Sequence, residues 1–157
     1  MNPNVDCFFV YTDQSSSQKL VDQCRDSSLV NHVYVLAPNS VQLNNCEVII
    51  VEENGSCSTI RLIAKLLRAD FALLALGDSS VEIGQGAIER LLQVAEYTDA
   101  PMVYADYMEM KDGVLSSYPV IDYQLGSLRD DFNFGPVRFF RSEVLKAFRY
   151  ENYETLK

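Results

Sequence analysis

Residues 71–80 read Phe-Ala-Leu-Leu-Ala-Leu-Gly-Asp-Ser-Ser and decide the fold class that the sequence predicts. The first six are all apolar, whereas a strand with one solvated face alternates apolar and polar residues. Such a run is typical of a strand in the middle of a parallel sheet that helices cover on both faces. The glycine, aspartate and serines then predict a loop at the carboxyl end of that strand. Open α/β sheets bind their ligands at this end.

Strand-length apolar runs alternate with stretches of helical periodicity on both sides of this segment. The other predicted strands cover residues 7–11, 32–36, 47–51, 102–105, 107–111, 114–118 and 137–140. The predicted helices cover residues 18–24, 60–67, 86–95 and 142–148. The serines at 15–17 are expected to cap the first helix, and Ser58 or Thr59 to open the second. Asp112-Gly113 predicts a tight hairpin turn. This order predicts an α/β fold, a Rossmann-type sandwich with a central, mostly parallel sheet, helices on both faces and an antiparallel end with a hairpin.

Composition predicts one globular domain. The chain has 157 residues, of which 48% are hydrophobic, and a net charge of −9. An acidic chain without a basic cluster is a poor binder of nucleic acid or anionic membrane, and no apolar run is long enough for a transmembrane segment. The four cysteines, at positions 7, 24, 46 and 57, form no Cys-x-x-Cys pair. They therefore favour reduced thiols and a cytoplasmic protein.

Candidate ligand-binding residues follow the predicted strands. Thr12-Asp13, Glu53, Asp78 and Asp106 all lie just after apolar runs. The chain has neither the Gly-x-Gly-x-x-Gly of dinucleotide enzymes nor a phosphate loop ending in Gly-Lys, which disfavours both classes. A carboxylate in the position of Asp78 can hold a divalent cation that bridges a diphosphate. The alternative is that Asp78 and Ser79 cap the next helix.

The order of these segments resembles family 2 glycosyltransferases of the GT-A type. The resemblance spans roughly residues 5–150 and rests on their order and spacing rather than on a single motif. The segments that carry it are residues 10–14, 53–55, 60–61, 68–76, 87–92, 102–107 and 134–141.

The resemblance implies a GT-A-like domain that transfers a sugar from a nucleoside diphosphate sugar to a hydroxyl of a saccharide or lipid-linked acceptor. It implies Mg²⁺ or Mn²⁺ on the diphosphate, with Asp78 as the metal contact. Thr12 and Asp13 are expected to contact the nucleotide and Arg61 to lie near the diphosphate, while Glu53 and Asp106 complete the predicted nucleotide-sugar site. We expect residues 1–157 to form a single domain that is the N-terminal part of a longer protein.

The sequence departs from the family at the metal motif. Gly77 and Ser79 stand where the family has its two aspartates, so that Asp78 occupies the variable position between them. No general base for the acceptor hydroxyl can be assigned. Two functions therefore stay open: a sugar transferase, or a divergent non-catalytic GT-A-like domain that binds a nucleotide sugar or serves as an assembly surface.

Overall fold

Two strands that are buried at every position form the middle of the sheet. In the computed structural model, which describes residues 2–52, 56–120, 124–125 and 132–147, these strands are β1 (Val5–Val10) and β4 (Phe71–Ala75). They pair in parallel, with Phe8 opposite Leu74. The prediction that the run from residue 71 is a central strand of a parallel sheet is therefore confirmed.

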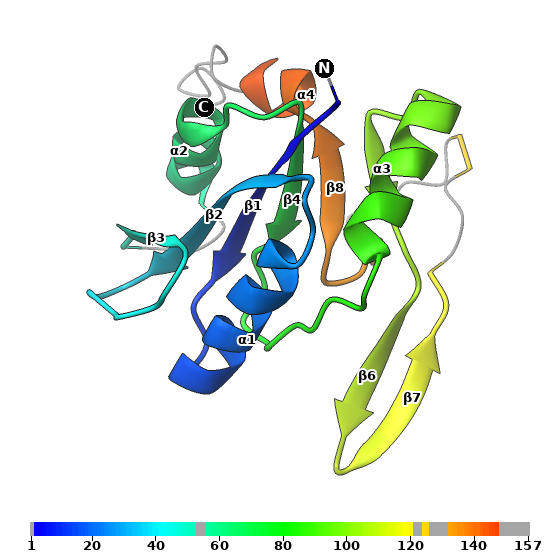
Figure 1. Ribbon diagram of the computed structural model, residues 1–157. Coiled ribbons are helices and arrows are strands. Elements are labelled where there is room, and N and C mark those ends of the chain that lie inside the picture. Colours follow the sequence, from blue (N-terminus) through cyan, green and yellow to red (C-terminus); the bar gives the residue numbers. More distant parts are fainter. Residues whose placement is uncertain (1, 53–55, 121–123, 126–131, 148–157) are drawn as a thin grey trace, which may run out of the picture.

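The main sheet of the described chain has six strands in the order β3-β2-β1-β4-β8-β5 (Figure 1). The other strands of this sheet are β2 (Val30–Ala37), β3 (Glu47–Ile50), β5 (Met102–Tyr104) and β8 (Arg138–Arg141). In this sheet of the described residues, β8 runs opposite to the other five strands, and it lies between β4 and β5. The antiparallel part lies at one end of the sheet, as expected, but β8 and β5 form it, whereas the hairpin does not join this sheet. β8 comes late in the chain but lies between two earlier strands, β4 and β5. Local sequence patterns do not predict such an insertion.

Helices cover both faces of the sheet, as predicted. α1 (Gln14–Arg25) and α3 (Ala87–Thr98) pack on the face that contains Phe9 and Leu73, while α2 (Cys57–Leu66) and α4 (Ser142–Ala147) pack with the face that contains Phe8. Successive side chains of a strand point to opposite faces, so β1 supplies apolar groups to both layers. Among the described residues, no helix is long and apolar enough to cross a bilayer.

Two helix starts differ from the sequence prediction. Asp13 caps α1 by accepting a hydrogen bond from the backbone N–H of Ser16 at 2.9 Å, so the serines at 15–17 lie inside the helix. Ser56 caps α2, two or three residues before the predicted Ser58 or Thr59. Both errors arise because consecutive residues could each accept the first free N–H groups of a helix. Asp78 and Ser79 cap no helix, because α3 begins eight residues after Ser79, at Ala87.

The predicted hairpin is present as a separate sheet of β6 (Tyr107–Lys111) and β7 (Val114–Tyr118). Asp112 and Gly113 adopt positive φ angles of 51° and 78°, as a tight hairpin turn with two left-handed residues requires. The hairpin projects from the rest of the molecule (Figure 1).

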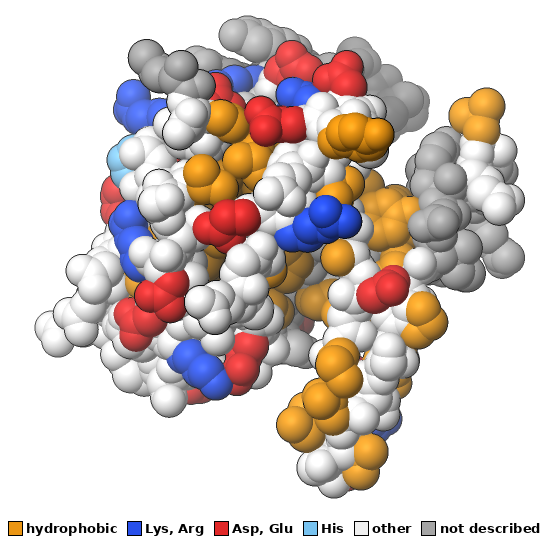
Figure 2. All heavy atoms as spheres, turned by 45° about the vertical axis from the view of Figure 1, so that its right-hand side comes forward, with side chains coloured by type: hydrophobic (Ala, Val, Ile, Leu, Met, Phe, Trp, Pro, Cys, Tyr) orange, Lys and Arg blue, Asp and Glu red, His pale blue; other side chains and the backbone are white. Residues whose placement is uncertain are grey.

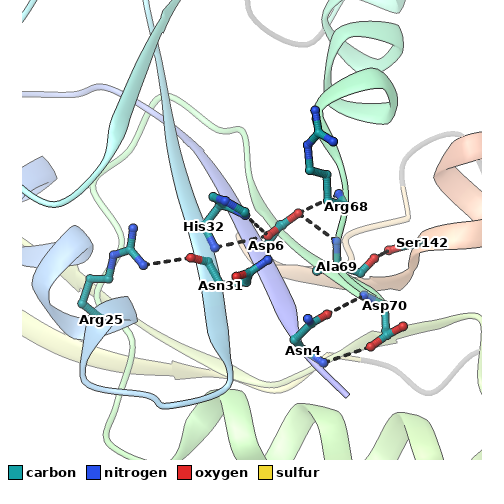
Figure 3. A network of polar contacts seen from close by, with 9 residues as sticks. All are labelled: Asn4, Asp6, Arg25, Asn31, His32, Arg68, Ala69, Asp70 and Ser142. Carbon is teal, nitrogen blue, oxygen red and sulfur yellow. Dashed lines mark hydrogen bonds and ion pairs between the residues drawn. The ribbon is translucent and has the colours of Figure 1, made fainter. Parts of the chain in front are cut away.

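A buried carboxylate connects the amino-terminal ends of β1, β2 and β4 (Figure 3). Asp6 on β1 is 0% exposed. Its Oδ2 accepts hydrogen bonds from the backbone N–H groups of Arg68 and Ala69 at 2.8 and 3.0 Å, and its Oδ1 accepts one from the N–H of His32 at 3.2 Å. The Nδ1 of His32 also lies 3.1 Å from Oδ1. Asp6 therefore fastens β2 and the segment before β4 to β1.

Candidate functional site

A small hollow lies at the carboxyl ends of β1 and β4. From β1 the chain continues to β2 and β3 on one side and later returns to β4 on the other, so the order of the strands reverses here. Ligands of open α/β sheets bind at such a reversal. The residues that line the hollow come from the end of β1, the start of α1, the end of β4 and the loop after it: Phe9, Val10, Thr12, Ser16, Ser17, Leu20, Ala75, Ser79, Ser80 and Val81.

The turn from β1 into α1 is held by its own polar groups. The backbone N–H of Thr12 donates to Oγ of the buried Ser17 at 3.1 Å. Asp13 lies next to Thr12, and the hydrogen bond from the backbone N–H of Ser16 lowers the pKa of its carboxyl below the usual value. Asp13 therefore stays ionised at neutral pH and presents an anionic acceptor beside the hollow, at the positive end of the helix dipole.

The loop after β4 forms the other wall and is fastened to α1. Nζ of Lys19 lies 2.6 Å from Oε1 of Glu82, and the backbone N–H of Ile83 donates to Oε1 of Gln23 at 2.9 Å. The volume of the hollow is about 10 Å³, which is roughly the space of one water. A nucleotide is much larger, so it can reach this site only by lying across the rim or by displacing the loop.

The structure brings together some of the predicted site residues. Thr12 lines the hollow, and the exposed Asp78 directly precedes two of its lining residues, Ser79 and Ser80. Asp13 caps the helix at the same edge.

Other predicted site residues lie elsewhere. Arg61 lies on α2, which packs with the opposite face of the sheet, and it does not line the hollow. Asp106 follows β5 at the base of the hairpin, where its Oδ1 accepts a hydrogen bond from the N–H of Val120 at 2.7 Å. Glu53 lies outside the described residues.

Sequence reasoning missed Ser16 and Ser17 as lining residues. The signal was present for Ser17, because Ser17, Leu20, Val21 and Cys24 follow the spacing of one helix face and all four are buried. Expecting the helix to begin at residue 18 placed Ser17 in the preceding turn.

The described residues do not by themselves form a metal centre. They contain no group of three or more His, Cys, Asp and Glu side chains that could hold a metal ion. The carboxylate of Asp13 already caps α1. A cation at Asp78 would therefore depend on oxygens of a bound ligand, as Mg²⁺ often does at phosphate sites.

No family model and no curated protein matches the chain. The chain does match solved structures. One is CMP:2-keto-3-deoxy-manno-octonic acid synthetase complexed with CTP, which is 15% identical with a TM-score of 0.60, over 92% of this chain and 77% of that one. Another is mannosyl-3-phosphoglycerate synthase from Rubrobacter xylanophilus, 13% identical with a TM-score of 0.58. That match covers 90% of this chain and 55% of the synthase, so this chain spans little more than half of that protein.

The likeness concerns the fold. Together with the strand order, it confirms the predicted GT-A-like, Rossmann-type α/β sandwich. Membership in family 2 of the glycosyltransferases stays a prediction.

Proposed function

We propose that this domain binds a nucleotide-activated sugar at the hollow between β1 and β4 and transfers its glycosyl group to an acceptor hydroxyl. The observation that carries the proposal is the position of the hollow, at the reversal of strand order and between the turn at Thr12 and the loop of Ser79 and Ser80. The names of the two structural neighbours, a CMP-sugar synthetase complexed with CTP and a mannosyl-phosphoglycerate synthase, support a nucleotide or nucleotide sugar as the ligand.

In this proposal Thr12 and Asp13 contact the nucleotide, and Asp78 faces the diphosphate. Asp13 is an ionised acceptor, which suits the N–H and O–H donors of a base or ribose rather than a phosphate. A divalent cation, Mg²⁺ or Mn²⁺, would lie between Asp78 and the diphosphate oxygens and offset the charge of the leaving group. Arg61 and Asp106 stay predictions as ligand contacts, since neither lines the hollow.

A second candidate function is a divergent domain that binds the nucleotide sugar without turnover. The metal motif favours it, because Gly77 and Ser79 flank Asp78 where the family has two aspartates, which leaves one carboxylate at this motif. Release of free nucleotide from a nucleotide sugar distinguishes the two functions. A domain that binds without catalysing releases none above the rate of the uncatalysed control.

Filling the hollow is expected to weaken ligand binding. In Ser80→Phe, the added ring occupies the space between the β4 loop and α1, so titration calorimetry with UDP, GDP or CTP should show affinity reduced by about tenfold or more. Gln93→Phe adds the same ring at an exposed position of α3 and should bind like the unmodified protein. Equal affinities for the two variants, or no binding of any nucleotide by the unmodified protein, would contradict the proposed site.

Removing the Asp78 carboxylate is expected to abolish any metal dependence of binding. The affinity of the unmodified protein for a nucleoside diphosphate should rise when Mn²⁺ is added, because the cation screens the diphosphate from an acidic protein. For Asp78→Ala, titrations with and without Mn²⁺ should give the same affinity. A Mn²⁺ effect that survives in this variant would exclude Asp78 as the metal contact while leaving the nucleotide site in place.

A further inference from the structure

Three aromatic side chains form a cluster at the carboxyl end of β5. Tyr104 is the last residue of β5, and Phe132 and Phe134 lie shortly before β8. The ring of Tyr104 meets those of Phe132 and Phe134 edge-on at 6.2 and 5.2 Å, and the two phenylalanine rings lie 4.6 Å apart. All three side chains are only partly buried, so solvent reaches the cluster. Figure 2 shows hydrophobic side chains between the body of the molecule and the base of the projecting hairpin, which follows β5.

An exposed arginine lies beside this aromatic cluster. Arg138 is the first residue of β8 and pairs with Leu74 of β4 on one side and with Tyr104 on the other. Its Cζ lies 6.0 Å from the centre of the Phe134 ring, at the distance of a cation–π contact. No carboxylate of the described residues forms an ion pair with Arg138. Its guanidinium is therefore held against an aromatic ring, and its N–H groups are available to a ligand.

The turn before β8 fixes the positions of the ring and the arginine. Gly135 adopts a φ of +76°, and a Cβ at this position would lie 3.3 Å from Cδ1 of Tyr107. The backbone N–H of Gly135 donates to Oδ1 of Asn133 at 2.8 Å, and Nδ2 of Asn133 donates to the hydroxyl of Tyr107 at 3.1 Å. The turn thus packs against the base of the hairpin. Phe134 and Arg138 are in place before a ligand binds, which lowers the entropy that binding must overcome.

The cluster lies on the same edge of the sheet as the hollow. Along this edge the strands follow in the order β1, β4, β8 and β5, and β8 runs antiparallel, so its first residue lies at the carboxyl ends of the others. With a strand spacing of about 4.8 Å, Arg138 and Tyr104 lie about 5 and 10 Å beyond β4. In the proposed function the nucleoside lies at Thr12 and the diphosphate at Asp78. The glycosyl group is attached to the far end of the diphosphate, so its acceptor is expected beyond β4, at β8 and β5.

We infer that Arg138 and the aromatic cluster bind the acceptor, and that this acceptor is a sugar or polyol that bears a phosphate or a carboxylate. The role as acceptor rests on the proposed function. The rings provide apolar surface for the C–H groups of the ligand, and the arginine fork donates to two oxygens of its anionic group. The chain carries a charge of −9, which repels an anion unless a cation offsets the repulsion where the anion binds. Arg138 is such a cation.

Removing the charge of Arg138 tests the recognition of the anion. Arg138→Met keeps the length of the side chain, and Arg90→Met removes the same charge from an exposed position of α3, which packs on the face of Phe9. Titration calorimetry with glucose 6-phosphate, glucuronate and glucose distinguishes phosphate, carboxylate and neutral sugars. At least one anionic sugar should bind to the unmodified protein and to Arg90→Met more tightly than glucose does. Arg138→Met should bind that sugar about tenfold more weakly or worse, with the affinity for UDP, GDP or CTP unchanged.

Replacing one ring tests the aromatic cluster separately. Phe134→Leu keeps an apolar side chain and removes the ring, and it should weaken the binding of the anionic sugar while leaving the binding of inorganic phosphate unchanged. Phe134 and Arg138 lie outside the buried core, so these variants should melt at the temperature of the unmodified protein. If Phe134→Leu binds the sugar as the unmodified protein does, the rings do not contact the ligand.

Three results would overturn the inference. The first is that neither anionic sugar binds to the unmodified protein, with or without a nucleotide present. The second is an equal loss of affinity in Arg138→Met and Arg90→Met, which would show a general effect of charge. The third is a weaker binding of UDP, GDP or CTP to Arg138→Met, which would assign Arg138 to the donor. Sugar binding that depends on Arg138 without binding of any nucleotide would instead contradict the proposed function and leave the anion site in place.

Discussion

Replacing Asp6 with alanine is expected to lower the free energy of unfolding by about 2–6 kcal/mol, because two backbone N–H groups lose their acceptor at a cost of about 1–3 kcal/mol each. The carboxylate, which is itself fully buried, accepts hydrogen bonds from three backbone N–H groups and lies within hydrogen-bond distance of the partly exposed His32 ring. Without it, the N–H groups of Arg68 and Ala69 lose their acceptor. Such a loss is a large share of the total stability of an ordinary domain.

Asp70 provides a matched control in the same network (Figure 3). Its carboxylate is exposed, and its Oδ2 accepts a hydrogen bond from the N–H of Asn4 at 3.1 Å. Asp70→Ala should therefore lower the free energy of unfolding by only about 1 kcal/mol, because water can replace the lost acceptor. Urea denaturation of both variants measures the difference. Similar losses for the two would mean that Asp6 is less important to the fold than its burial indicates.

Replacing Phe139 with alanine is expected to have an effect of similar size, about 3–5 kcal/mol, because it opens a cavity in the core. The side chain lies on β8 and is 1% exposed, and its ring stacks on that of Phe71 at 5.2 Å and 14°. Phe139 thus holds the antiparallel strand against β4. Thermal and urea denaturation should show the loss as a lower melting temperature and a lower urea midpoint.

Phe140, the next residue of β8, provides the control for Phe139→Ala. Phe140 points to the opposite face of the sheet and is only partly buried. Phe140→Ala removes the same ring from the same strand, so it should destabilise the protein by less than Phe139→Ala. If Phe140→Ala has the larger effect, the assignment of Phe139 to the main core is wrong.

The sequence predicts the parts of the fold that depend on neighbouring residues. The central strand at residues 71–76 and the turn at Asp112-Gly113 are confirmed, because continuous apolar character and positive φ angles are local requirements. The position of β8 between β4 and β5 is not a local property. Neither is the burial of Asp6, because a lone aspartate at the start of a strand has the same appearance whether or not distant N–H groups surround it.

The residues of the candidate site also fall into a part that the sequence predicts and a part that it does not. Thr12 and the loop at Ser79 come together because parallel strands end at one edge of the sheet, which topology alone predicts. Arg61 was assigned by resemblance, and its helix packs with the face opposite α1. Which face a helix covers depends on how the chain crosses the sheet, and no pattern within residues 57–66 contains that information.

The insertion of β8 has a consequence for how the chain assembles during synthesis. In the main sheet β5 pairs only with β8, and β8 also covers the free edge of β4. After β5 (Met102–Tyr104) has been synthesised and before β8 follows, β4 is an unprotected sheet edge and β5 has no partner in this sheet. Such edges recruit other nascent chains, and pairings between distant segments form slowly. The arrival of Arg138–Arg141 therefore ends the period in which this polypeptide is most exposed to misassembly.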